Sequence, residues 1–161
     1  MMEALTPALL WFSALGCGLI AGVYFAFSTF IMTSFARIAP PAGVTAMNSI
    51  NVVIVKSAFL PLFFATTLTA AALAAIALFR WGEPGTVAML AGGLIYVLGM
   101  FVLTIVFNVP LNDALAAADP SRPAGAALWA RYLKDWTFWN HVRTAAALIA
   151  SALFIFAIAA R

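Results

Sequence analysis

Charged side chains are the scarcest feature of this sequence. Asp, Glu, Lys and Arg make up 8% of the 161 residues, whereas 66% are hydrophobic. A soluble domain has about a quarter of its residues charged, because its surface must be hydrated, and this composition excludes such a surface. The apolar residues also form runs as long as the roughly 20 residues that a helix needs to cross a bilayer. The sequence therefore predicts an integral membrane protein with the lipid bilayer as its main partner.

The residues that hold metals and redox centres are almost absent. The chain has one cysteine, Cys17, and one histidine, His141. A single thiol excludes an intrachain disulfide, and the two residues together cannot form a bis-histidine haem, a zinc site or an iron–sulfur cluster. The five carboxylates show no ligand spacing. We therefore expect no metal and no cofactor.

Basic residues outnumber acidic ones, eight to five, but they form no cluster. No two of them are adjacent, so a nucleic-acid partner is not expected, and their places beside apolar runs are typical of residues that orient a membrane protein. Six are expected at one end of the protein: Arg37, Lys56, Arg122, Arg131, Lys134 and Arg143. This bias places both termini outside the cytoplasm, in the inner (plasma) membrane.

Breaker residues divide the apolar sequence into four helices. The N-terminal run lacks a basic start and is longer than a signal peptide's apolar region, so we expect an uncleaved helix. A second helix is expected over residues 44–79, and a third that ends or kinks at Asn108-Val109-Pro110. Short connections predict a single domain, residues 1–161, that is an all-α, membrane-spanning antiparallel four-helix bundle. The spanning parts are predicted at residues 5–31, 52–79, 86–107 and 144–160.

Small residues recur at every fourth position of the first span. They are Ala14, Gly18, Gly22 and Ala26. Such a stripe allows the backbone of another helix to approach closely. The neighbour is a helix of the same chain or of a second copy, so a homodimer stays open.

The unusual polar residues gather at one end of the predicted bundle. Asn48 and Asn51 share a face of the second helix, as do Asn108 and Asn112 of the third if that helix continues past the proline. Polar residues at membrane depth usually face the bundle interior. The fourth helix carries a stripe with a spacing of three or four residues: Trp129, Leu133, Trp136, Asn140 and Arg143. Together with Tyr24 and Ser28 these residues predict a shared site.

Each of these residues also has an interpretation without chemistry. Trp129 and Trp136 are suited to anchoring at the membrane interface, and Lys56 and Arg143 to snorkelling. The asparagines are suited to hydrogen bonding between helices. His141 lies two residues before Arg143, about 160° away around the helix, which argues against its facing the same site.

Four segments resemble the anthrone oxygenase-like family of small four-helix membrane proteins. They are GLIAGVYF at 18–25, MNSIN at 47–51, NVPLN at 108–112 and WTFWNHVRT at 136–144. The segments occur in order over nearly the whole chain, and the last two patterns are the most specific. Fungal members of this family oxidise an anthrone to an anthraquinone with O2 and no recognised cofactor, whereas bacterial members are mostly uncharacterised.

The resemblance implies a cofactor-independent oxygenase acting on an apolar phenolic or polycyclic substrate. In that scheme Arg143 pairs with the substrate anion, and the neutral donors are Asn108, Asn112 and Asn140. His141 is the base, with Asp113 in reserve. The expected substrate-binding residues are Asn48, Asn51, Asn112, Trp136, Trp139 and Tyr24. The alternative is a non-enzymatic membrane protein, such as a small-molecule binder, a transporter subunit or a scaffold.

Overall fold

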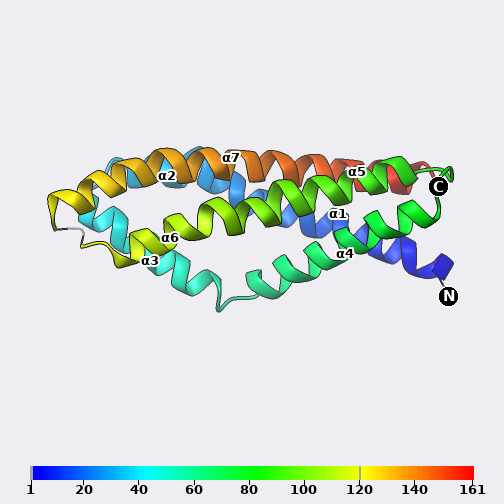
Figure 1. Ribbon diagram of the computed structural model, residues 1–161, viewed down its shortest axis with the longest axis horizontal. Helices are drawn as coiled ribbons and strands as arrows, with labels where there is room; N and C mark the ends of the chain where they lie inside the picture. Colours follow the sequence, from blue (N-terminus) through cyan, green and yellow to red (C-terminus); the bar gives the residue numbers. More distant parts are fainter. Residues whose placement is uncertain (1, 120) are drawn as a thin grey trace.

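Four long helices dominate the computed structural model, which describes the backbone of residues 2–119 and 121–161 and the side chains from residue 5 onward within those ranges. The described residues form helices and no strand. Four helices are long and apolar enough to cross a membrane: Leu5–Phe35, Phe59–Phe79, Thr86–Ala117 and Pro123–Ala159. Figure 1 shows them side by side, with α1 beginning and α7 ending at the same end of the molecule. The predicted all-α fold with four membrane-spanning helices is confirmed.

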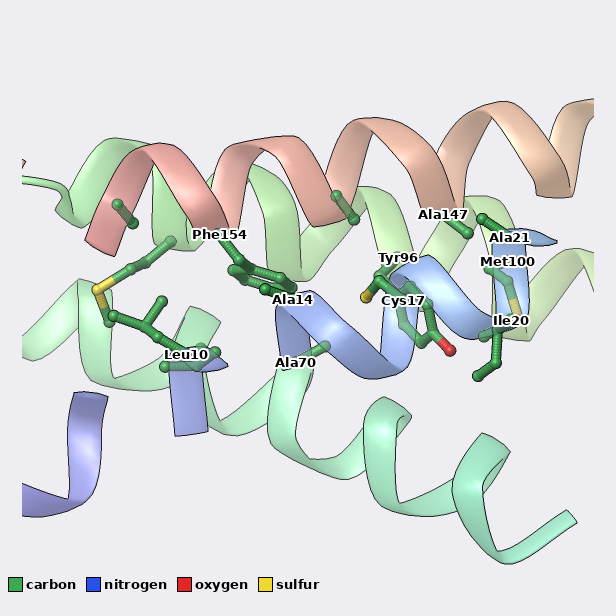
Figure 2. Packing of buried hydrophobic residues seen from close by; sticks show 14 of the residues in the cluster. Leu10, Ala14, Cys17, Ile20, Ala21, Ala70, Tyr96, Met100, Ala147 and Phe154 are labelled. Carbon is green, nitrogen blue, oxygen red and sulfur yellow. The ribbon is translucent and has the colours of Figure 1, made fainter. Parts of the chain in front are cut away.

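The first and fourth long helices form the centre of the bundle. The first consists of α1 (Met2–Ala26), a π-helical turn (Phe27–Ile31) and α2 (Met32–Phe35), and it packs against α7 (Pro123–Ala159). Figure 2 shows Cys17 and Ala21 among the side chains between them, both fully buried. Small side chains at these positions let the two backbones approach closely.

The predicted small-residue stripe is only partly used within the chain. Ala14 is buried, and its carbonyl oxygen accepts a hydrogen bond of 2.8 Å from the Ser151 hydroxyl. A Cβ added at Gly18 would lie 3.6 Å from the same hydroxyl oxygen, whereas one added at Gly22 would meet nothing within 4 Å. Homodimerisation through the open part of the stripe stays a prediction.

The second helix is not continuous, which corrects the expectation of one helix over residues 44–79. It is divided into α3 (Pro40–Ile54) and α4 (Phe59–Phe79), so the second span begins at Phe59 and not at residue 52. Pro61 gives the reason. Inside a helix it would leave the Ser57 carbonyl without its donor and clash with it, whereas in a first turn no such donor is needed. Figure 1 shows α3 and α4 meeting at an angle, away from the other helices.

The third helix does not end at residue 107, which corrects the expected span of 86–107. It runs through α5 (Thr86–Tyr96), two π-helical segments (Val97–Val102 and Thr104–Asn108) and α6 (Val109–Ala117). Pro110 lies in the first turn of α6, directly after the second π-helical segment. In a regular α-helix its ring would clash with the carbonyl of Val106, and π-type adjustment is a known way for membrane helices to accommodate proline.

Close packing of α4 on α5 depends on Gly93, and this gives a first prediction. A Cβ at Gly93 would lie 2.5 Å from the Ala70 carbonyl oxygen and 2.7 Å from the Ala74 Cβ. We expect Gly93→Ala to lower the free energy of unfolding by about 1–3 kcal/mol, because the two helices must separate. Gly22→Ala is the matched control and should cause no loss. Reversible unfolding in mixed detergent micelles measures both, and an equal loss in the two variants would contradict the prediction.

Candidate functional site

A cavity of about 230 Å³ lies where all the long helices meet α3. Its lining is mainly apolar and aromatic: Tyr24, Phe27, Met47, Ile50, Ile54, Val55, Phe59, Leu60, Phe63, Phe64, Phe101, Ile105, Val109 and Trp136. Four further lining residues are polar or charged: Asn51, Thr104, Asn112 and Arg143. No carboxylate is among these lining residues, so Arg143 gives the cavity a positive charge.

Arg143 is the central polar group of this cavity, and its side chain comes from α7. Only 3% of the residue is exposed. Its Nη1 donates to the Thr104 hydroxyl oxygen at 3.2 Å, and its Nη2 donates to Asn140 Oδ1 at 2.8 Å. The guanidinium carbon lies 4.2 Å from the centre of the Tyr24 ring and 5.3 Å from that of Trp136. Cation–π contacts of this kind stabilise a desolvated guanidinium.

The charge of Arg143 has no counter-ion in the described part of the chain. The ion pairs found there join other residues: Arg80 with Glu83, Arg122 with Asp119, and Arg131 with Asp135. The buried Nε of Arg143 also has no hydrogen-bond partner among the described residues. A buried cation that is solvated only by neutral groups favours an anion beside it.

Asn140 fixes the position of Arg143 and joins α7 to the first helix. Its Nδ2 donates to the Tyr24 carbonyl oxygen and to the Ser28 hydroxyl, both at 2.7 Å. The Ser28 and Thr144 hydroxyls lie 3.2 Å apart and extend this network. Asn140 is fully buried and does not line the cavity. Its side chain is therefore placed to orient Arg143 and lies behind the lining of the cavity.

Asn108 has a similar place behind the cavity wall. It is 1% exposed, and its Nδ2 donates to the Trp136 carbonyl oxygen at 3.2 Å. This bond joins the third helix to α7 at the residue that precedes the arginine by two turns. Asn108 is not among the lining residues, so the structure places it, like Asn140, away from direct contact with a ligand.

A second polar group lies toward the α3 side of the cavity. Tyr132 donates a hydrogen bond of 2.7 Å to Asn112 Oδ1, and Asn112 and Asn51 both line the cavity. The Nδ2 of Asn51 is buried and makes no hydrogen bond of 3.5 Å or less to the described residues, although the side chain interacts with the Tyr132 hydroxyl. Asn48 instead donates to the Leu115 carbonyl at 3.4 Å, and it does not line the cavity. This group offers neutral hydrogen bonds at a place separate from Arg143.

Besides Asn48, Asn108 and Asn140, the predicted residues His141 and Trp139 and the reserve base Asp113 lie outside the cavity lining, because helix rotation turns them away. His141 is exposed, because it lies about 160° around α7 from Arg143. Asp113 is exposed next to the lining residue Asn112. Trp139 stacks on Phe107 with ring centres 3.8 Å apart, and both line a separate hollow on another side of α7. The expected roles of His141 as base and Trp139 as ring partner therefore lose their geometric basis.

The apolar lining residues of α3, α4 and the third helix were not predicted from the sequence, and neither were two side chains that contact predicted site residues, Thr104 and Tyr132. Thr104 contacts Arg143, and Tyr132 stacks between Trp129 and Trp136, with ring centres 5.7 Å apart in each pair. The signal for Thr104 was its place four residues before Asn108, on the same spacing as Asn112. Tyr132 lies three residues after Trp129 and four before Trp136, the same spacing as the predicted stripe, but it was not included in that stripe.

Among the described residues, no group of three or more His, Cys, Asp or Glu side chains lies close enough together to hold a metal ion. The arrangement instead suits a flat, apolar molecule with one acidic oxygen. Such an oxygen would accept hydrogen bonds from the guanidinium of Arg143, and the rings would lie among aromatic side chains.

Comparison with known proteins identifies one family. The family model described as anthrone oxygenase matches residues 51–153, which is more than half of the chain. The match includes Asn51, Thr104, Asn112, Trp136 and Arg143, and it confirms the resemblance inferred from the sequence. No curated protein and no solved structure matches the chain.

Proposed function

This chain belongs to the anthrone oxygenase family, and on that premise we propose that it is a multi-pass membrane oxygenase whose cavity binds the anion of a flat phenolic or polycyclic substrate for reaction with O2. The observation that carries the proposal is Arg143, which is buried against an apolar cavity and has no carboxylate partner in the described residues. An anthrone is such a substrate, because loss of a proton from its central carbon gives an aromatic anion with the charge on oxygen.

Arg143 would drive the first step by electrostatics. A fixed positive charge in a site without bulk water stabilises the developing oxyanion and favours the ionised form of the substrate. None of the described lining residues is His, Asp or Glu. We therefore assign the ionisation to the field of Arg143, with the proton released toward the membrane–water interface past the polar group around Asn51 and Asn112.

The oxidation then follows from the chemistry of the anion. The anion passes one electron to O2, which gives a carbon-centred radical and superoxide. The two combine at the central carbon to form a C–O bond, and protonation gives a hydroperoxide. Loss of the remaining proton on that carbon breaks the O–O bond, releases hydroxide and leaves a carbonyl. The balance is one anthrone and one O2 converted to one anthraquinone and one water.

The remaining residues would position these reactants. Thr104 and Asn140 orient the guanidinium, while Tyr24 and Trp136 flank it and give the rings aromatic neighbours. Asn51 and Asn112 are placed to hydrogen-bond a second oxygen of the substrate. Asn108 supports Trp136 from behind.

The distribution of charge supports an orientation. Besides the buried Arg143, five basic residues lie exposed at the end where the cavity is: Arg37, Lys56, Arg122, Arg131 and Lys134. Arg80 and Arg161 lie at the other end. Basic residues favour the cytoplasmic side, so we place both termini outside the cytoplasm of the inner membrane and the cavity toward the cytoplasm.

The lack of a base among the lining residues also favours a second candidate function. A protein that only binds an already ionised aromatic acid needs Arg143 and the apolar cavity but no proton acceptor. Such a binder would hold the ligand with the same residues and would not consume O2.

Oxygen uptake with anthrone tests the proposal. We expect purified protein to consume O2 above the spontaneous rate and to form one anthraquinone per O2. His141→Gln should change this rate by no more than about twofold, because exposed substitutions of this kind change free energies by about 0.5 kcal/mol. Uptake no faster than buffer, with tight binding of anthraquinone, would favour the binder. Loss of uptake in His141→Gln would contradict the assignment of the ionisation to Arg143.

A further inference from the structure

The cavity opens sideways, between the α3–α4 connection and the third long helix. Four residues that line it are also largely exposed: Val55 (51%), Phe64 (48%), Ile105 (51%) and Val109 (40%). We call these four the mouth. All four are apolar, so the opening suits contact with lipid better than contact with water.

Other walls of the cavity are closed by buried side chains. Tyr24, Phe27, Met47, Trp136 and Arg143 each have 8% or less of their surface exposed. They come from the first helix, α3 and α7. Exposure of the lining residues is therefore concentrated on the side where α4 begins and the third helix passes it.

The length of α4 indicates the depth of the mouth in the membrane. Its 21 residues, Phe59–Phe79, rise about 32 Å at 1.5 Å per residue, close to the roughly 30 Å of a hydrocarbon core. The start of α4 thus marks one boundary of the core. The exposed Lys56 precedes it, at the level where a lysine reaches the headgroups.

The third helix agrees with this depth. It begins at Thr86, at the end where α4 finishes, so at the rise of a regular α-helix Ile105 lies about 28 Å and Val109 about 34 Å along it, and the π-helical segments make these distances upper bounds. The mouth therefore lies at the boundary between the acyl chains and the headgroups of one leaflet. Arg143 lies inside, behind this apolar rim.

We propose that the cavity receives its ligand laterally from this leaflet, and that the ligand is an amphiphilic phenol that resides at the boundary between acyl chains and headgroups. The inference rests on the proposed function in taking the cavity as the substrate site. The rings pass between the side chains of the mouth, and the acidic oxygen moves from the headgroup level near Lys56 to Arg143. A substrate dissolved in water does not need such an opening.

A spin label tests the lipid contact of the mouth without any ligand. The native cysteine is first removed by Cys17→Ala, and a spin label is attached to Ile105→Cys in the full chain in lipid nanodiscs. The control carries the label at Arg131→Cys, an exposed position of α7. We expect the label at 105 to collide mainly with O2, which concentrates in lipid, and the label at 131 to collide mainly with a water-soluble nickel complex. Equal access of the nickel complex to both labels would overturn the proposal.

Binding kinetics test the passage itself. Ile105→Trp and Val109→Trp narrow the mouth, whereas Leu98→Trp adds the same bulk to an exposed position of the third helix that does not line the cavity. We expect the two mouth variants to slow both association and dissociation of an anthraquinone in nanodiscs about tenfold, a barrier about 1.4 kcal/mol higher, while Leu98→Trp keeps the wild-type rates. Unchanged rates in the mouth variants would overturn the proposal. Wild-type protein that neither binds anthraquinone nor consumes O2 would instead overturn the proposed function, and the spin labels would still decide where the mouth opens.

Discussion

Arg143→Gln is expected to lower the turnover of anthrone about 100-fold, because removing one donor to a developing oxyanion commonly has an effect of this size. The substitution removes the positive charge next to the cavity and keeps an amide that can still bond to Asn140. Stability should change little, since the cost of burying an unpaired charge disappears together with its hydrogen bonds. Oxygen uptake and thermal unfolding of the same preparation measure the two effects.

Two further variants separate charge from shape. Arg143→Lys keeps the charge but loses the planar guanidinium that bonds to Thr104 and Asn140 at once, so we expect activity between wild type and Arg143→Gln. Arg131→Gln removes an arginine from the same helix whose side chain is 71% exposed, and it should leave activity unchanged. Equal losses in Arg131→Gln and Arg143→Gln would contradict a specific role of Arg143.

Thr104→Asp is expected to weaken binding of an anionic ligand about 100-fold, as strongly as loss of the arginine itself. The Thr104 hydroxyl lies 3.2 Å from Nη1 of Arg143, so a carboxylate there would pair with the guanidinium. The positive charge of Arg143 would then be neutralised by the new carboxylate. Arg143 and its other neighbours would be unchanged. Titration with a phenolic anthraquinone, followed by tryptophan fluorescence, measures the affinity.

Thr104→Asn is the matched control, because asparagine has the shape of aspartate without its charge. We expect its affinity to stay within about threefold of wild type, the size of a modest hydrogen-bond change. Similar losses in Thr104→Asp and Thr104→Asn would mean that the hydroxyl matters and the charge balance does not. That result would remove the main support for an anionic substrate.

The fold was largely predictable because lipid imposes a simple rule on the sequence. Runs of apolar residues separated by breaker residues indicated four helices, and the structure has four helices long and apolar enough to cross a membrane. The errors arose at two prolines. The second helix is interrupted just before α4, which has Pro61 in its first turn. The third helix continues through Pro110. A proline marks a place where a helix bends, ends or adjusts, but hydropathy does not decide which of these happens.

The site was predictable where helical spacing alone decides which residues share a face. Five residues of α7 were predicted on one stripe, and four of them are buried, while Leu133 is partly exposed: Trp129, Leu133, Trp136, Asn140 and Arg143. The same spacing argued against His141, which is exposed. Thr104 was missed although it lies four residues before Asn108, because one threonine in an apolar run does not by itself indicate a site.

The π-helical segments of the third helix have a consequence for comparing related sequences. Residues 97–102 and 104–108 are wound more loosely than an α-helix, which is commonly the mark of one residue inserted into a regular helix at a functional position. A relative that lacks one residue here closes the loose turn into a regular α-helix, and the residues on either side keep their faces. A single-residue gap in α6 before Asn112 would instead turn the following residues by about 100° and move Asn112 away from Tyr132. Where a single-residue gap falls in an alignment therefore separates relatives that retain this cavity from those that have lost it.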